Sequence, residues 1–352
     1  MILQFIKDLL YDSGKAFSLI SDKLDQLWAL TPLPPALLSI IIKFAVAGVA
    51  AGFVAVNALF IILMERKVSA YMHQRRGPNR VGPFGLLQTV ADTVKLLIKE
   101  DIVPTAADKA IFTIAPLIVF LSTFLVFLVI PFGNGIIAAD LDIGILYVLA
   151  VTGLAVIGIL AGGWGSNNKY SLIGGLRSAA QIVSYEIPAV LVILAVVLLA
   201  GSMKMGDIVA AQQKVWYIVL QPVGFLLFLI ASNAEINRTP FDLPEAESEL
   251  VAGFNTEYSA MKFALFFLGE FTNLFLAGAL ATTLFLGGWH GPVLPPVVWF
   301  MLKTYFVVFI LMWWRWTFPR TRVDQLMAFS WKVLLPIALL NLVITAVAVK
   351  LI

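Results

Sequence analysis

The chain has 352 residues, of which 61% are hydrophobic and 13% are charged, and its formal net charge is +3. Soluble domains are about 45–50% apolar and carry about 25% charged residues, so this composition excludes an ordinary soluble domain. The apolar residues form long solid runs rather than the alternation of a membrane barrel, which indicates an all-α integral membrane protein. A net charge this small gives no reason to expect nucleic acid as a partner.

The residue types that hold redox centres are nearly absent. The chain contains no cysteine and only two histidines, His73 and His290, which lie far apart in the sequence. Iron–sulfur clusters are held by cysteine thiolates, and haem iron by axial ligands such as histidine. We therefore expect this chain to bind no metal or flavin and to contribute no catalytic redox group of its own.

Taken in chain order, the hydrophobic pattern predicts one interfacial helix followed by membrane spans. Residues 1–30 show apolar residues at three-to-four spacing with charges between them, typical of a helix lying at a membrane interface. Eight apolar runs follow, each long enough to cross ~30 Å of hydrocarbon at ~1.5 Å per residue. The prediction is a single transmembrane bundle over residues 1–352, with about eight transmembrane helices and amphipathic surface helices. The runs cover residues 37–64, 110–132, 143–165, 180–201, 214–232, 258–287, 299–318 and 331–350.

The basic residues predict the orientation of this bundle. About two thirds of the 24 lysines and arginines flank the connections that follow odd-numbered runs, and such connections remain on the cytoplasmic side. This places the basic connection 65–109 and the acidic connection 233–257 together on the cytoplasmic (or matrix) face. We expect a bacterial inner membrane, or alternatively the mitochondrial inner membrane, with both termini on the periplasmic side of a bacterial protein.

The basic connection, residues 65–109, combines turns with a second amphipathic pattern. Gly77-Pro78 and Gly82-Pro83 are turn signals, and apolar residues then recur at helical spacing from Leu86 to Ile98. This predicts a helix on the membrane surface. The arginines of the turn either anchor the chain to anionic lipid or dock another subunit or a polar ligand; they are Arg75, Arg76 and Arg80.

The acidic connection, residues 233–257, holds six carboxylates against one cation, Arg238. Pro240 and Pro244 forbid a continuous helix through its first half, because proline lacks the backbone N–H and disfavours helix at the residue before it. So many acids in one connection of so apolar a chain indicate a function. They are Glu235, Asp242, Glu245, Glu247, Glu249 and Glu257.

Two more carboxylates fall inside predicted spans. Glu186 lies near the start of the fourth run and Glu270 near the middle of the sixth. A carboxylate at that depth is costly unless it is protonated, paired or hydrated, so it indicates an ion or proton pathway by default. The alternative is a protonated carboxyl that only forms a hydrogen bond between helices.

Four segments resemble one family, the quinone-binding membrane subunit of respiratory complex I. The family occurs in the NADH-quinone oxidoreductase of bacteria and, as subunit 1 of NADH dehydrogenase, in mitochondria. The similarity runs from about residue 37 to the C-terminus, and the family also has eight spans. Its segments here are ERKVSAYMHQRRGPNRVGPFGLLQTVADTVKLLIKED, SNNKYSLIGGLRSAAQIVSYE, AEINRTPFDLPEAESELVAGFNTEYS and FPRTRVDQLM.

The resemblance implies a partner set and residue roles. Quinone is the substrate, and NADH, FMN and the iron–sulfur clusters lie in partner subunits. Those partners are a peripheral arm that bears the terminal cluster, small membrane subunits and antiporter-like subunits, with phospholipid around them. The implied quinone-chamber residues are Arg66, Arg75, Arg238 and Phe241, with the first-helix region Phe53 to Phe60. The implied proton path comprises Glu186, Glu235, Asp242, Glu245, Glu247, Glu249, Glu257 and Glu270.

Three classes of function remain open at this point. The first is a subunit that couples quinone reduction to proton translocation, and its variant is the membrane anchor of a related hydrogenase or other cofactor dehydrogenase. The second is a free-standing ion transporter, for which inverted repeats are expected and none is visible in the sequence. The third is a passive anchor, which does not explain carboxylates such as Glu186 and Glu270 inside spans.

Overall fold

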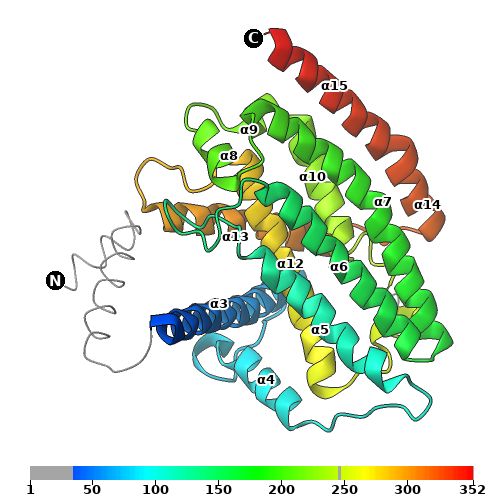
Figure 1. Ribbon diagram of the computed structural model, residues 1–352. Helices are drawn as coiled ribbons and strands as arrows, with labels where there is room; N and C mark the ends of the chain where they lie inside the picture. Colours follow the sequence, from blue (N-terminus) through cyan, green and yellow to red (C-terminus); the bar gives the residue numbers. More distant parts are fainter. Residues whose placement is uncertain (1–34, 245–246, 352) are drawn as a thin grey trace.

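The computed structural model describes residues 35–244 and 247–351, and side chains within 48–244 and 249–351 (Figure 1). The described residues form helices joined by turns, and no β-strand occurs among them apart from an isolated bridge between Gly133 and Ile136. Seven of the described helices are long and apolar enough to cross a membrane. The all-α membrane fold predicted from composition is therefore confirmed. The interfacial helix predicted over 1–30 lies outside the described residues.

The long helices match most of the predicted runs. They are α3 (Pro35–Met72), α5 (Lys109–Val126), α6 (Gly144–Gly165), α7 (Lys169–Ala200), α12 (Ala260–Phe285) and α13 (Pro296–Thr317). The last long helix is composed of α14 (Val323–Phe329), a π-helical turn (Ser330–Leu334) and α15 (Leu335–Leu351), which follow one another directly. The short elements are η1 (Pro83–Gly85), α4 (Gln88–Ile98), α8 (Met205–Ala211), α9 (Tyr217–Leu220), α10 (Pro222–Glu235), α11 (Glu247–Leu250) and η2 (Gly253–Asn255).

Two departures from the predicted runs matter for the site. The run 214–232 is not one span, because Pro222 separates α9 from α10, and α10 has only 14 residues. Helix α7 begins at Lys169, eleven residues before the predicted run, because the Asn168 side chain caps it by accepting from the Tyr170 N–H at 2.9 Å. Glu186 therefore lies near the middle of α7 rather than near its start.

The helices pack around α7 and α12. Helix α7 contacts α6, α10 and α15, while α12 contacts α5, α13, α3 and α10. In Figure 1, α3 crosses the direction of α5, α6 and α7, and the α14–α15 arm lies along one edge. This arrangement brings the ends of α3, α10 and α13 to the same region as the middle of α12.

Glycines permit two of these close contacts. A Cβ on Gly158 of α6 would lie 2.5 Å from Val119 Cγ2 of α5. A Cβ on Gly174 of α7 would lie 2.7 Å from the Gly253 Cα, in the acidic connection. Small residues at helix interfaces allow this approach in membranes, where no hydrophobic force draws helices together. Because Gly174 has no side chain, the backbone of the acidic connection can pack directly against α7.

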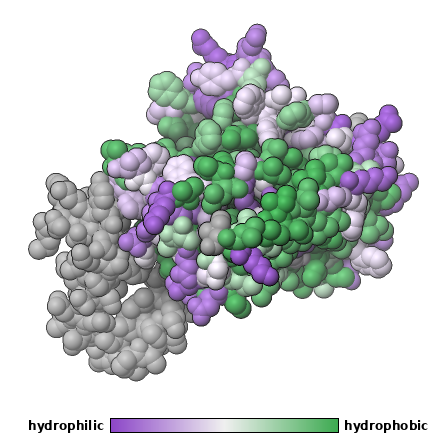
Figure 2. Space-filling model, turned by 90° about the horizontal axis from the view of Figure 1, so that it is seen from above, coloured by the Kyte–Doolittle hydropathy of each residue, from purple (hydrophilic) through white to green (hydrophobic). Residues whose placement is uncertain are grey.

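The outer surface is apolar over wide areas. Figure 2 shows hydrophobic residues over much of the visible face, with hydrophilic residues gathered mainly towards its margins. Large exposed apolar side chains occur on every long helix, and they are frequent on the arm formed by α15. Such a surface suits contact with lipid or with other membrane subunits.

Candidate functional site: a buried ion-pair network between two cavities

The centre of the site is Arg238, in the turn that follows α10. Its side chain is only 1% exposed, and its Nη1 donates to Glu65 Oε2 of α3 at 2.6 Å. Its Nη2 lies 3.1 Å from Glu270 Oε1 of α12, and its guanidinium carbon lies 4.7 Å from the centre of the Phe271 ring. Glu65 also accepts a hydrogen bond from Nη1 of Arg315, near the end of α13. Four charged side chains from four segments therefore form one network.

The network balances two carboxylates against two guanidinium groups. Burying an isolated charge costs several kcal/mol, and pairing offsets this cost only when geometry and hydrogen bonds are good. Arg238 spans both carboxylates because its planar fork carries donors on separate nitrogens. Removing one member would leave an unbalanced buried charge, which destabilises proteins by about 3–5 kcal/mol.

A first cavity adjoins this network, and we name it the arginine-lined cavity. It has a volume of about 350 Å³. Arg66 on its wall is held by Asp92 of α4, with Nη1 and Oδ2 2.5 Å apart, so the surface helix fixes part of the lining. Cations, one carboxylate and aromatic rings share the wall. The lining residues are Ile62, Glu65, Arg66, Ser69, Arg75, Pro78, Phe267, Phe271, Arg315 and Trp316.

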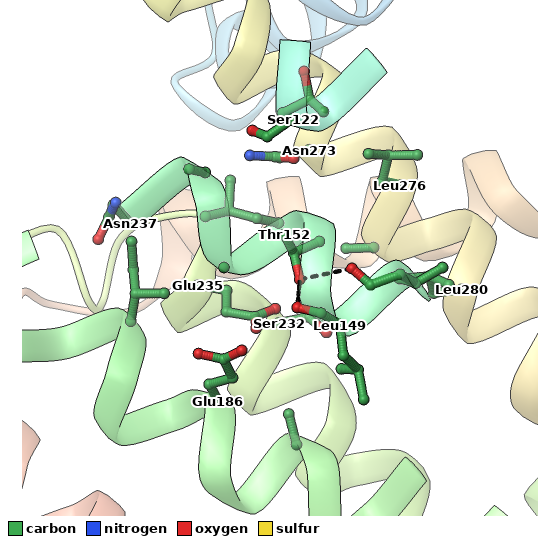
Figure 3. A pocket seen from close by; sticks show the side chains of 18 of the residues that line it. Ser122, Leu149, Thr152, Glu186, Ser232, Glu235, Asn237, Asn273, Leu276 and Leu280 are labelled. Carbon is green, nitrogen blue, oxygen red and sulfur yellow. Dashed lines mark hydrogen bonds between the residues drawn. The ribbon is translucent and has the colours of Figure 1, made fainter. Parts of the chain in front are cut away.

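A second cavity is lined by residues of α6, α7, α10 and α12, and we name it the carboxylate cavity. It has a volume of about 110 Å³ and is lined by Glu186 of α7, Glu235 at the end of α10 and Glu270 of α12. In Figure 3 the carboxylates of Glu186 and Glu235 point into the same space. The wall is mostly apolar, but it carries enough polar groups for water molecules, which need two to four polar partners each, and the volume has room for several of them. Further polar groups on the wall are Ser122, Thr123, Thr152, Ser232, Asn237, Asn255 and Asn273.

Glu270 connects the two cavities. It lines the carboxylate cavity, and Arg238 joins it to Glu65, which lines the arginine-lined cavity. A single guanidinium therefore contacts one carboxylate from the wall of each cavity. Three of the predicted carboxylates, Glu186, Glu235 and Glu270, meet at this place.

Three other carboxylates of the acidic connection have described side chains, and each has its own partner away from this cavity. Asp242 pairs with Arg320 at 2.7 Å, and Glu249 pairs with Arg177 at 2.6 Å. The neighbouring Arg177 holds the pKa of Glu249 below its usual range. Glu257 accepts from the Asn168 side chain at 2.6 Å. Glu245 lies outside the described residues, and Glu247 begins α11 with its side chain outside the described part.

The structure also places the predicted chamber residues at different sites. Arg66 and Arg75 line the arginine-lined cavity, and Arg238 is bonded to one of its wall residues. Phe241 is buried against Tyr185, with ring centres 5.3 Å apart, and lines neither cavity. Phe53 and Phe60 are partly exposed on α3, before the segment that reaches the cavity.

Sequence reasoning missed two members of the network, Glu65 and Arg315. Glu65 was assigned to the connection 65–109, and Arg315 was counted among the basic residues that flank a connection although it lies within the predicted run 299–318. Helix α3 continues to Met72 and α13 to Thr317, so both side chains belong to helices. Glu65 is the single acid of α3, and Arg315 stands in the apolar context WWRW. A charge within a helical apolar run was the signal that identified Glu270, and it applies equally to these two residues.

Among the described residues, no group of three histidine, aspartate or glutamate side chains is arranged to hold a metal ion. The chemical contribution of the side chains of this site is electrostatic stabilisation and proton exchange. Arginines in a partly enclosed space stabilise an anion or a polarised carbonyl oxygen, and the carboxylates behind them can exchange protons.

Comparison with known proteins identifies the family. A sequence model of NADH dehydrogenase matches residues 44–346. The H subunit of the NADH-quinone oxidoreductase of Geobacillus kaustophilus is 58% identical over 309 residues, which cover 85% of this chain and 92% of the relative. Its counterpart in Carboxydothermus hydrogenoformans is 54% identical over 305 residues, covering 86% and 87%. The counterpart in Dehalococcoides mccartyi is 58% identical over 295 residues, covering 84% and 83%. The chain therefore belongs to the NADH dehydrogenase family and is a membrane subunit of an NADH-quinone oxidoreductase, an enzyme complex.

Proposed function

We propose that the arginine-lined cavity is part of a quinone chamber, and that this chain transmits the charge change of quinone reduction to the carboxylate cavity. The observation that carries the proposal is the position of Arg238, which contacts Glu65 on one side and Glu270 on the other. Each of these carboxylates lines a different cavity, so one guanidinium connects the two spaces.

The chemistry of a quinone fits the lining of the first cavity. Reduction to the quinol takes up two electrons and two protons, and an electron that arrives before its proton adds a negative charge. Two unit charges 4 Å apart interact by about 4 kcal/mol at an effective dielectric constant near 20. Arg66, Arg75 and Arg315 on the wall stabilise that charge. The electrons come from partner subunits that hold NADH, FMN and iron–sulfur clusters, since this chain has no cysteine to ligate a cluster.

Coupling follows from competition for Arg238. An anion in the chamber attracts the guanidinium and weakens its interaction with Glu270, whose carboxylate then binds a proton. When the neutral quinol leaves, Arg238 returns to Glu270 and the proton is released. Glu235 and Glu186 share the cavity with Glu270, so the three titrate as a coupled set and pass the proton on.

The proposal extends to partners and orientation. The turn after α3 presents Arg76 and Arg80 as exposed charges with the highly exposed ring of Phe84, which suits docking of a peripheral arm. Small and antiporter-like membrane subunits, and phospholipid, would cover the apolar helix faces. Because basic residues remain in the cytoplasm, this turn faces the cytoplasm and the termini face the periplasm of a bacterial inner membrane.

The test compares two Glu→Gln variants in the assembled complex, in sealed membrane vesicles. Glu270→Gln removes the charge that Arg238 connects to the chamber, whereas Glu257→Gln replaces a carboxylate whose hydrogen bond from Asn168 an amide oxygen can still accept. We expect Glu270→Gln to lower quinone reduction or proton yield at least about tenfold. NADH oxidation by a soluble acceptor that bypasses the quinone should remain normal in both variants.

Three outcomes would contradict the proposal. Full quinone reduction with an unchanged proton yield in Glu270→Gln would leave the chain as a passive anchor. Proton flux through the isolated subunit without NADH or quinone would instead indicate a free-standing transporter. Equal losses in Glu270→Gln and Glu257→Gln would show a general effect on the fold rather than a role for the network.

A further inference from the structure

Gln181 of α7 is a fully buried amide outside both cavities, with 0% of its surface exposed. Its Nε2 donates to the backbone oxygen of Ala234 at 2.7 Å and to that of Phe241 at 2.6 Å. Both N–H groups of the amide are therefore used, and both acceptors belong to the segment that carries Arg238. A side chain on one helix thus bridges the two ends of a charged turn.

The turn between these two carbonyls also has internal bonds. The Arg238 N–H donates to the Asn233 oxygen at 3.3 Å, and the Phe241 N–H donates to the Arg238 oxygen at 2.8 Å. Two further bonds hold one residue of the turn each: the Asn237 amide donates to Ser178 Oγ, which is also on α7, and Thr321 donates to the Pro240 oxygen. Among the described contacts, Gln181 is the side chain from another element that fixes both ends of the turn.

We propose that Gln181 is a positioning residue. By bonding both ends of the turn, it holds residues 234–241 in the conformation in which Arg238 reaches Glu65 and Glu270 at the same time. This inference rests on the proposed function of the Arg238 network. The contact from Arg238 Nη2 to Glu270 is already 3.1 Å long, close to the upper limit of a hydrogen bond. A shift of the turn by ~0.5 Å away from α12 therefore takes this contact beyond hydrogen-bond range, whereas the 2.6 Å bond to Glu65 tolerates the same shift.

The same bridge places a second charged group. Ala234 precedes Glu235, so the bond from Gln181 to its carbonyl fixes the backbone from which Glu235 enters the carboxylate cavity. Glu186 belongs to the same helix as Gln181. Loss of the bridge therefore changes the relation of Glu235 to Glu186 as well as that of Arg238 to Glu270.

The chain provides a matched control in Gln212. This glutamine is also 0% exposed, and its Nε2 also donates to two backbone oxygens, those of Ile208 at 3.2 Å and Thr283 at 2.8 Å. It lies in the turn after α8 and lines neither cavity. Substitutions at Gln212 therefore report the general cost of losing a buried glutamine bridge.

The informative substitution is Gln181→Glu, because it makes the bridge depend on a proton. An ionised carboxylate has no donor for the two carbonyls, whereas a protonated carboxyl donates to one of them. Acidification should therefore restore part of the activity in this variant. The charged groups on the elements packed around position 181 are Arg177 and Glu186 on α7, Glu235, Arg238 and Asp242 on the turn, and Arg320, Arg322 and Asp324 on the connection from α13 to α14 and its start.

The experiment measures quinone reduction by the assembled complex between pH 5.5 and 8, with NADH oxidation by a bypassing acceptor as the reference. We expect Gln181→Ala to lower kcat about 10- to 100-fold at all pH values, since a misplacement of ~1 Å can cost that much. Gln181→Glu should approach wild type as pH falls, and both Gln212→Ala and Gln212→Glu should keep the wild-type profile. If Gln181→Ala reduces the amount of complex, Gln181→Asn, which keeps a shorter amide, takes its place.

The inference is overturned if Gln181→Glu follows the wild-type pH profile, or if Gln181 variants behave as the Gln212 variants do. That result is distinct from failure of the proposed function, which Glu270→Gln tests separately. Normal coupling in Glu270→Gln removes the proposed function whatever position 181 does. Impaired coupling in Glu270→Gln with normal Gln181 variants removes only the positioning role.

Discussion

Tyr305 of α13 donates a hydrogen bond to Asn57 Oδ1 of α3, with the two oxygens 2.6 Å apart. Asn57 is 4% exposed, and the Tyr305 ring packs edge-on against Phe60 and Phe275. Further along the same two helices stand Glu65 and Arg315. The Asn57–Tyr305 bond therefore fixes the register in which α3 and α13 present their charged partners to each other.

The first prediction concerns this register. Tyr305→Phe removes one hydrogen bond and leaves the buried Asn57 without its donor, so we expect a loss of about 0.5–1.5 kcal/mol in stability. The change should appear as faster thermal inactivation of the complex, with kcat for quinone reduction nearly unchanged at low temperature. Phe309→Leu, at an exposed position of the same helix, serves as the control. Unaltered thermal inactivation in Tyr305→Phe would argue against a role for the bond in register.

The second prediction uses charge balance in the Arg238 network. Arg238→Gln leaves Glu65 and Glu270 with Arg315 as the remaining cation of the network, and breaking a buried pair typically costs about 3–5 kcal/mol. Adding Glu270→Gln removes the surplus negative charge, so the double variant should assemble in larger amounts than Arg238→Gln alone. Its quinone reduction should still be low, because the connection between the cavities is lost.

The second prediction is checked by measuring the amount of intact complex on native gels. The variants compared are Arg238→Gln, Glu270→Gln and the double variant that combines them. A double variant that assembles no better than Arg238→Gln contradicts the charge-balance account. Arg238→Lys adds a further comparison. Lysine keeps the charge but lacks the planar fork, so it should assemble well and still lose coupling.

The third prediction concerns acid sensitivity at the connection between α12 and α13. Burial and the nearby Lys303 ammonium hold the pKa of His290 below its usual range. The Lys303 Nζ donates to the backbone oxygens of Leu286, Gly288 and His290 itself, at 2.6–3.0 Å. The folded protein therefore keeps this imidazole neutral at a pH at which the unfolded chain would bind a proton.

The sign of the effect follows by linkage. The stability that a neutral His290 contributes is complete above its unfolded pKa of about 6.5 and is lost as pH falls through that value towards the lower folded one. We expect the thermal stability of the complex to decrease between pH 7.5 and 5.5. His290→Gln, which cannot be protonated, should show a smaller decrease. Parallel curves for wild type and His290→Gln would rule out this histidine as a source of acid sensitivity.

The fourth prediction separates docking from lipid anchoring at the basic turn. Arg76→Glu with Arg80→Glu reverses two exposed charges that do not line the arginine-lined cavity. If the turn docks a peripheral arm, the amount of assembled complex should fall, and raised salt should weaken the wild-type association. Normal assembly with reduced membrane association of the chain would support lipid anchoring instead. Lys350→Glu, on α15, provides a charge-reversal control.

Much of the fold followed from the sequence, because spans depend on local composition. Seven long apolar helices formed where seven of the eight runs predicted them, and the exception was the run broken by Pro222. The proline was visible in the sequence, but its effect was not assigned. The position of Glu270 near the middle of its helix also followed from run length, whereas Glu186 was expected near the start of its run and lies near the middle of α7.

The site was predictable only in part, because its geometry depends on distant pairs. Arg238 and Glu65 are 173 residues apart, and Glu65 and Arg315 are 250 apart. Sequence pattern gives no measure of such pairing. The acidic connection was expected to act as one set of carboxylates, yet Asp242, Glu249 and Glu257 each have a separate partner. Gln181 has no local signal at all, since an amide in a helix is ordinary until its acceptors are known.

The short helix α10 ends where the turn that carries Arg238 contacts the middle of α12 at Glu270. Its 14 residues extend ~21 Å, about 9 Å less than the ~30 Å hydrocarbon thickness. A helix of that length cannot span the hydrocarbon by itself, so non-helical backbone must make up the rest of any crossing. Non-helical backbone at such depth persists only inside protein, where every carbonyl must find a donor. Gln181, Asn233 and Thr321 supply donors to the carbonyls of Ala234, Thr239, Pro240 and Phe241, so the backbone that carries Arg238 has its polar groups satisfied without continuing as a helix.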